Sequence, residues 1–140
     1  MTTAYDILST AIPALVEQGS PCVEGGRCRY LDSEGNRCVA GWALTQAEVD
    51  RLVTVQEGVR VLSETGILPE RLVPHTEVLA RLQSVHDDWS TLAGRRDLSG
   101  LERKNIREDI EVALRELEAL TADDPRNAPL IERYRALVLG

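Results

Sequence analysis

The amino-acid sequence predicts a mostly helical α+β domain in which four to five helices pack on one β-hairpin. Apolar residues recur at helical spacing along most of the chain. Two of these stretches follow a capping signal, a Ser or Thr with Glu three residues later. One short stretch instead alternates around a glycine turn, as hairpin strands do. The length of 140 residues fits a single domain, 1–140, whose first part, 1–94, precedes a helical pair over 95–140.

The first helix is predicted over Ala4–Gln18. Thr3 is expected to cap its N-terminus, and Gly19 is a typical residue just past a helix end. Pro13 lies inside the pattern, and since proline lacks an N–H we expect it to kink or split the helix.

A β-hairpin is predicted around Cys28–Ala40. The Asp-Ser-Glu-Gly sequence at 32–35 is typical of a type I turn followed by a glycine in the left-handed conformation. In that register Tyr30 lies opposite Cys38, on the face that also carries Cys28. The two thiols are then diagonal neighbours rather than a direct pair.

Two further helices are predicted after the hairpin. Thr45 and Glu48 form a capping box that begins one of them. Thr76 is expected to cap the other, which ends at Gly94. The stripe that we expect this helix to bury consists of Val78, Leu79, Leu82, Val85, His86, Trp89 and Leu92.

The C-terminal part is predicted to be an antiparallel pair of helices. Ser99 and Glu102 form a capping box at the start of the longest helix, over 100–120, and a last helix begins at Asp123-Asp124-Pro125. A long helix of this kind can also self-associate, so a homodimer through these helices is one prediction. The buried stripe of the long helix is expected to comprise Ile106, Ile110, Ala113, Leu114, Leu117 and Leu120.

Charge and composition limit the partners. The chain has 16 basic and 23 acidic residues, a net charge of -7 and a pI of about 4.9, which opposes a broad nucleic-acid interface. Such a charge is typical of a soluble protein, and a sharper alternative is an acidic face that binds a basic partner or competes with nucleic acid for one. The N-terminus has no basic signal-peptide region, and no apolar run reaches the ~18 residues of a membrane span. We therefore predict a cytoplasmic protein without membrane contact, whose three cysteines are reduced.

Two cysteines and a histidine are the residues that could carry chemistry. Cys28, Cys38 and His86 could form a thiol- or zinc-dependent site, but the close ligand pairs of structural zinc sites are missing. A catalytic thiol needs a braced base, and Asp87 points about 100° away from its neighbour His86 on a helix. We therefore expect packed core thiols, with no catalytic residue or cofactor, and keep zinc as the alternative.

Two motifs carry a resemblance to known proteins. The hairpin reads C-x-Y-x4-G-x2-C-x2-G, with its fixed positions at Cys28, Tyr30, Gly35, Cys38 and Gly41. The stretch 82–87 reads L-Q-x-x-H-D. Together they resemble a group of small uncharacterised proteins of bacteria and their phages, although Leu31 and Trp42 stand where that group often has arginine and an aliphatic residue. The resemblance implies a phage or mobile-element setting, and no particular reaction.

The sequence therefore predicts a non-enzymatic protein-interaction module, one that binds and modulates a host protein. Net acidity, the lack of a complete catalytic set and the helical C-terminal part support this interpretation. The residues that we single out as candidates for the interaction are Asp87, Asp88, Trp89, Glu108 and Glu111.

Overall fold

A computed structural model describes residues 1–22, 35–45, 47–48 and 59–140 of the chain. Every regular element within these ranges is helical. In order, the elements are α1 (Ala4–Gln18), α2 (Val39–Ala43), α4 (Val59–Glu64), the 3-10 helix η1 (Glu70–His75), α5 (Thr76–Gly94), α6 (Gly100–Leu120) and α7 (Asn127–Leu139).

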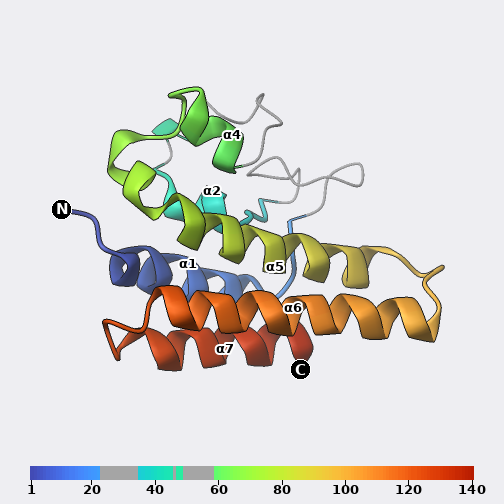
Figure 1. Ribbon diagram of the computed structural model, residues 1–140. Helices are drawn as coiled ribbons and strands as arrows, with labels where there is room; N and C mark the ends of the chain where they lie inside the picture. Colours follow the sequence, from blue (N-terminus) through green and yellow to red (C-terminus); the bar gives the residue numbers. More distant parts are fainter. Residues whose placement is uncertain (23–34, 46, 49–58) are drawn as a thin grey trace.

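Four long helices, α1, α5, α6 and α7, form the body of the molecule (Figure 1). α6 lies between α5 and α7 and contacts both, and α7 packs on α1. The short helix α2 contacts both α1 and α5, and α4 packs on α5 from the same side. None of the described helices is long and apolar enough to cross a membrane.

The predicted α+β class is wrong for the described residues, because they contain no strand. Residues 23–34, which hold Cys28, Tyr30 and most of the hairpin, lie outside them. Gly35 does have the predicted left-handed conformation, with φ of 85°. However, residues 36–38 form no strand, and the helix α2 begins at Val39.

The start of α2 explains this difference. The backbone N–H of Gly41 donates to Sγ of Cys38 at 3.4 Å, and the N–H of Trp42 donates to the Cys38 carbonyl at 3.1 Å. Cys38 therefore caps a helical turn. Val39 in this turn is fully buried. The helical turn therefore places an apolar side chain in the core, which is what the predicted strand was expected to do.

The capping signals predicted at Thr3 and Ser99 are confirmed. Thr3 and Asp6 exchange backbone and side-chain hydrogen bonds at 2.8 and 3.1 Å, and Ser99 and Glu102 do the same at 3.2 and 3.1 Å. Gly19 ends α1 with φ of 74°. These local interactions satisfy N–H groups that have no partner within the helix, so they fix where each helix begins.

Three smaller predictions about the helices need correction. Of the two effects predicted for Pro13, a split does not occur, because α1 is continuous from Ala4 to Gln18. Thr76 is the first residue of α5 and provides no cap, because its hydroxyl donates to the Val73 carbonyl at 2.6 Å. α7 begins at Asn127, later than the Asp-Asp-Pro sequence at 123–125 indicated.

The core lies between the four long helices and extends to α2, α4 and η1. Ile110, Leu114 and Leu117 of α6 are fully buried, as predicted, but Leu120 is 47% exposed. The Tyr134 hydroxyl donates to the Leu82 carbonyl at 3.0 Å and so links α7 to α5 inside the core. Burial raises the pKa of this phenol well above its usual value, so it stays a neutral donor.

Candidate functional site

Of the predicted thiol and histidine site, Cys28 lies outside the described residues, and His86 has a structural role. His86 is fully buried on α5, and its Nε2 accepts a hydrogen bond from the backbone N–H of Cys22 at 3.1 Å. One turn later, the Ser90 hydroxyl donates to the Cys22 carbonyl at 3.5 Å. Two side chains of α5 thus hold the backbone of a segment that follows α1.

This arrangement occupies the histidine. Because Nε2 accepts a hydrogen bond, it carries no proton, and the ring proton is assigned to Nδ1. Nδ1 lies 3.5 Å from Oδ1 of Asp87 but makes no hydrogen bond. The ring also meets Trp89 edge to face, with centroids 6.0 Å apart. Neither nitrogen offers a free lone pair, so His86 can act as a base or a metal ligand only if the Cys22 contact breaks.

The cysteines do not assemble a metal site in the part of the chain that the structure describes, where no three His, Cys, Asp or Glu side chains are grouped to hold an ion. Cys22 is disulfide-bonded, so the prediction of reduced thiols is wrong for this residue. That prediction followed from the expected cytoplasmic location, which does not prevent two of the three cysteines from pairing. Cys38 is buried at the start of α2.

A glutamine that the sequence analysis did not single out organises the neighbouring surface. The Gln18 amide oxygen accepts from the Arg37 N–H at 2.8 Å and from the Trp42 indole at 3.1 Å. Its nitrogen donates to the carbonyls of Ser20 at 2.6 Å and Arg37 at 3.1 Å. The Arg37 guanidinium stacks over the Trp42 ring, 5.0 Å from its centroid. The role of Gln18 depends on contacts 19 and 24 residues away, which no local pattern reveals.

The long seam between α5 and α6 carries the charged groups of greatest interest. Near one end, Arg81 Nε lies 2.5 Å from Oε2 of Glu116, an attractive pair between the helices. Two turns along each antiparallel helix from this pair, the same register places Asp88 opposite Asp109, whose charge acts on the Asp88 carboxyl. Hence the seam joins opposite charges at Arg81 and Glu116, and two turns away it brings the carboxylates of Asp88 and Asp109 together.

The electrostatics of Asp88 reflect that position. Partial burial, followed by repulsion from Asp109 and Asp87, raises the pKa of the Asp88 carboxyl to about 6. Among the described residues, neither Asp88 nor Asp109 has a hydrogen-bond or ion-pair partner. We call Asp87, Asp88 and Asp109 the acidic seam.

The structure separates the predicted interaction candidates. Asp87 is exposed and accepts a hydrogen bond from Gln83 at 2.8 Å. Trp89 is only 8% exposed, so it is largely a core residue. Glu111 is held by Arg135 at 3.1 Å, whereas Glu108 is exposed.

Asp109 was missed by the sequence analysis. Only the antiparallel register of α5 and α6 places it beside Asp88. In two antiparallel helices, the numbers of facing residues have a constant sum. Once both helices are assigned and one facing pair is known, this rule identifies Asp109 as the residue opposite Asp88.

The comparisons with known proteins found no matching family model, curated protein or solved structure. The resemblance carried by the cysteine and L-Q-x-x-H-D motifs therefore stays a prediction.

Proposed function

We propose that this chain is a non-enzymatic protein-interaction module that binds a basic surface of another protein through the acidic seam. The observation that carries the proposal is the pairing of Asp88 with Asp109 on adjacent helices without a cation between them. Repulsion between the two carboxylates raises the free energy of the unbound protein. An Arg or Lys side chain of a partner, placed between them, would relieve that repulsion.

The surroundings support a preformed site. The seam is built on two long helices whose contact is the most extensive between any two described elements. The carboxylates therefore stand on a rigid base, and ordering them on binding costs little conformational entropy. A phage or mobile-element protein that modulates a host protein fits such a surface, and this setting rests on the motif resemblance alone.

The test compares three forms of the protein as bait in a bacterial lysate. The seam variant is Asp88→Asn with Asp109→Asn. The control, Glu17→Gln with Glu64→Gln, removes the same charge from exposed positions outside the seam. We expect at least one protein to be retained equally by the wild type and the control, and about tenfold less by the seam variant, as measured by quantitative mass spectrometry.

A retained protein should also bind in a direct titration with the purified chain, and more weakly as salt increases. Equal retention by the seam variant and the control would reject the seam as the binding surface. Turnover of a small molecule by the purified chain would reject the non-enzymatic part of the proposal.

A further inference from the structure

A second charged surface lies where α6 extends beyond the end of α7. In Figure 1 the first turns of α6 and the end of α5 project past the C-terminal end of α7. At this end of the molecule, α7 no longer covers the side of α6 that faces it elsewhere. An open groove of about 510 Å³ occupies this position, lined by Gly100, Arg103, Lys104, Arg107, Glu108, Glu111 and Leu139.

The groove is locally basic within an acidic protein. Residues 95–107 hold five of the chain's 16 basic residues and two of its 23 acidic ones. Of the two carboxylates in the lining, Glu111 is already paired with Arg135 at 3.1 Å. Glu108 lies 3.8 Å from Lys104, at the far limit of an ion pair, and the Lys104 side chain is 71% exposed. The lining therefore presents more positive than negative charge.

Two of the cations are held in place by neutral groups. The Arg103 guanidinium donates to the carbonyls of Leu92 at 3.3 Å and Arg95 at 2.9 Å, at the end of α5. Arg107 donates to the Leu139 carbonyl at 3.2 Å, at the end of α7. Each guanidinium has five N–H donors, so these contacts orient it and leave donors for a carboxylate.

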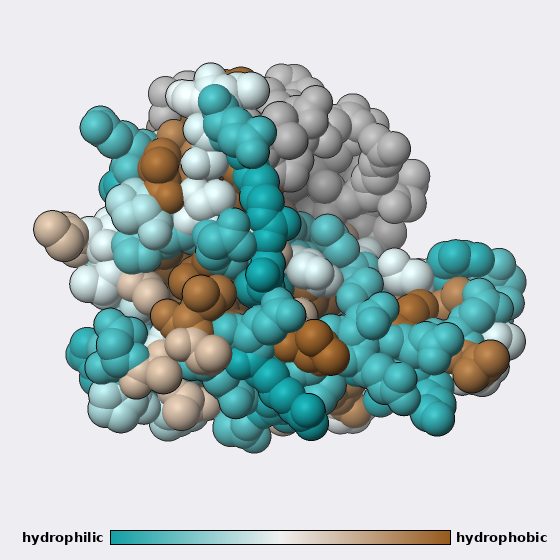
Figure 2. All heavy atoms as spheres, in the orientation of Figure 1, coloured by the Kyte–Doolittle hydropathy of each residue, from teal (hydrophilic) through white to brown (hydrophobic). Residues whose placement is uncertain are grey.

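We infer that this groove is a docking site for an acidic segment of another protein. The oriented guanidiniums would bind carboxylates with two parallel hydrogen bonds, and the exposed Lys104 would add a third positive charge. Leu139 in the groove and Leu101, 68% exposed near the tip, supply apolar contact beside the charges. Figure 2 shows the same projecting end as largely hydrophilic with hydrophobic residues near its tip.

This inference does not depend on the acidic seam, none of whose residues lines the groove. The two surfaces also select opposite charges. Removing cations from the groove would abolish binding of a partner that docks there, and neutralising the acidic seam would not. The two proposals can therefore be rejected independently.

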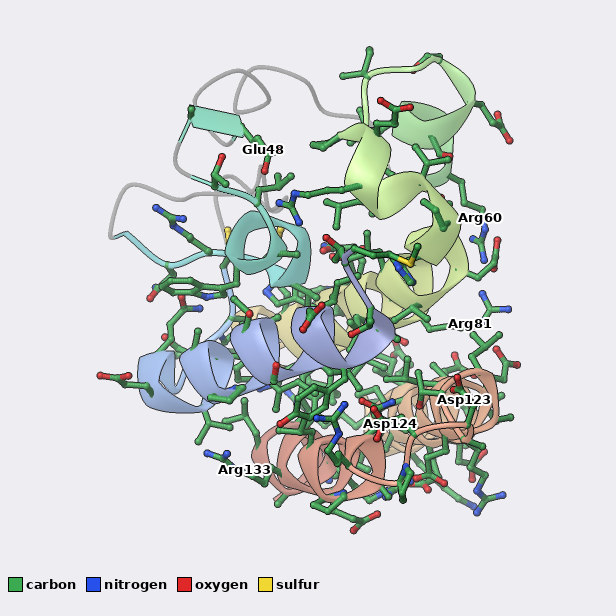
Figure 3. All side chains as sticks on the ribbon, turned by 90° about the vertical axis from the view of Figure 1, so that its left-hand side faces the viewer. Glu48, Arg60, Arg81, Asp123, Asp124 and Arg133 are labelled. Carbon is green, nitrogen blue, oxygen red and sulfur yellow. The ribbon has the colours of Figure 1, made fainter. Side chains whose placement is uncertain are left out.

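The test uses the full chain and a fluorescein-labelled octaglutamate peptide, with binding followed by fluorescence anisotropy at low salt. Lys104→Glu reverses one groove charge. Arg133→Glu makes the same change in net charge on the outer side of α7, as Figure 3 shows. We expect Lys104→Glu to weaken binding about tenfold and Arg133→Glu less than twofold, and Lys104→Arg to retain wild-type affinity.

Circular dichroism of each variant establishes that it is folded before binding is compared. The absence of saturable octaglutamate binding by the wild type would overturn the inference, as would equal weakening by Lys104→Glu and Arg133→Glu. Tighter binding of a single-stranded oligonucleotide than of octaglutamate would also overturn it, since the groove would then be a phosphate site.

Discussion

The helical bundle and the irregular backbone beside α1 are stabilised in different ways. In α5, α6 and α7 the backbone is satisfied within each helix, and apolar stripes join the helices. Outside these helices, side chains from other elements hold the described backbone: His86 accepts from the Cys22 N–H, and Gln18 accepts from the Arg37 N–H. The comparison shows that backbone outside helices needs specific distant side chains, whereas the bundle needs mainly volume and hydrophobicity.

The largest expected effect tests the bundle side of this comparison. Leu114 on α6 is fully buried, so Leu114→Ala removes packed methyl groups and leaves a cavity. We expect the free energy of unfolding to fall by about 3 kcal/mol in urea titrations followed by circular dichroism. Val112→Ala, on the same helix but 53% exposed, is the control and should change it by less than about 0.5 kcal/mol. A difference of under about 1 kcal/mol between the variants would mean that α6 does not pack as described.

A smaller effect is expected on the irregular side. Gln18→Met keeps a side chain of similar length but removes the hydrogen bonds to Arg37 and to the Trp42 indole. Because these groups are only partly buried, water replaces some of the lost bonds, and we expect a loss of about 1–2 kcal/mol. Hydrogen exchange should accelerate at the Arg37 amide and the Trp42 indole more than at amides of α6.

Glu17→Met is the matched control, since Glu17 is the exposed preceding residue of the same helix. It should leave exchange at both sites unchanged. Uniform acceleration across the whole chain in Gln18→Met would show that Gln18 stabilises the molecule as a whole and has no local anchoring role.

The same contrast explains what could be predicted from the sequence. The bounds of α1 and α6 follow from caps and stripes that lie within a few residues of each other, and both were predicted correctly. The Thr45 and Glu48 capping box was found as well, with hydrogen bonds of 2.8 and 3.3 Å. Local chemistry decides these features, so a local reading is enough.

The failures lie where distant contacts decide. The stretch 38–43 is short and apolar, and alternation alone could not distinguish a strand from the helical turn that packs against α1 and α5. His86 was identified as a buried residue, but its hydrogen bond to Cys22 spans 64 positions. Similarly, predicting the pairing of Asp88 with Asp109 requires the register between α5 and α6, and no local sequence pattern indicates that register.

The acidic seam offers the smallest and most specific test, because it is a place where the bundle carries an unfavourable interaction. The pKa of Asp88 is raised from 3.8 to about 6 in the folded protein, first by burial and then by Asp109 and Asp87. Between these two pH values the folded chain binds more protons at Asp88 than the unfolded chain does. Its contribution to stability therefore decreases as pH rises through this window, and the ionised carboxylate destabilises the fold above about pH 6.

Asp88→Asn should consequently be more stable than the wild type at pH 8 and lose that advantage near pH 4. Full conversion of a shift of about two pKa units would give about 3 kcal/mol, but solvent screening of this partly exposed group reduces the expected gain to about 0.5–1 kcal/mol. Urea unfolding at both pH values measures the difference, with Asp123→Asn as a control that removes the same charge from the exposed loop between α6 and α7 (Figure 3). An equal gain at both pH values would contradict the repulsion between the two helices and would leave the acidic seam an ordinary solvated surface.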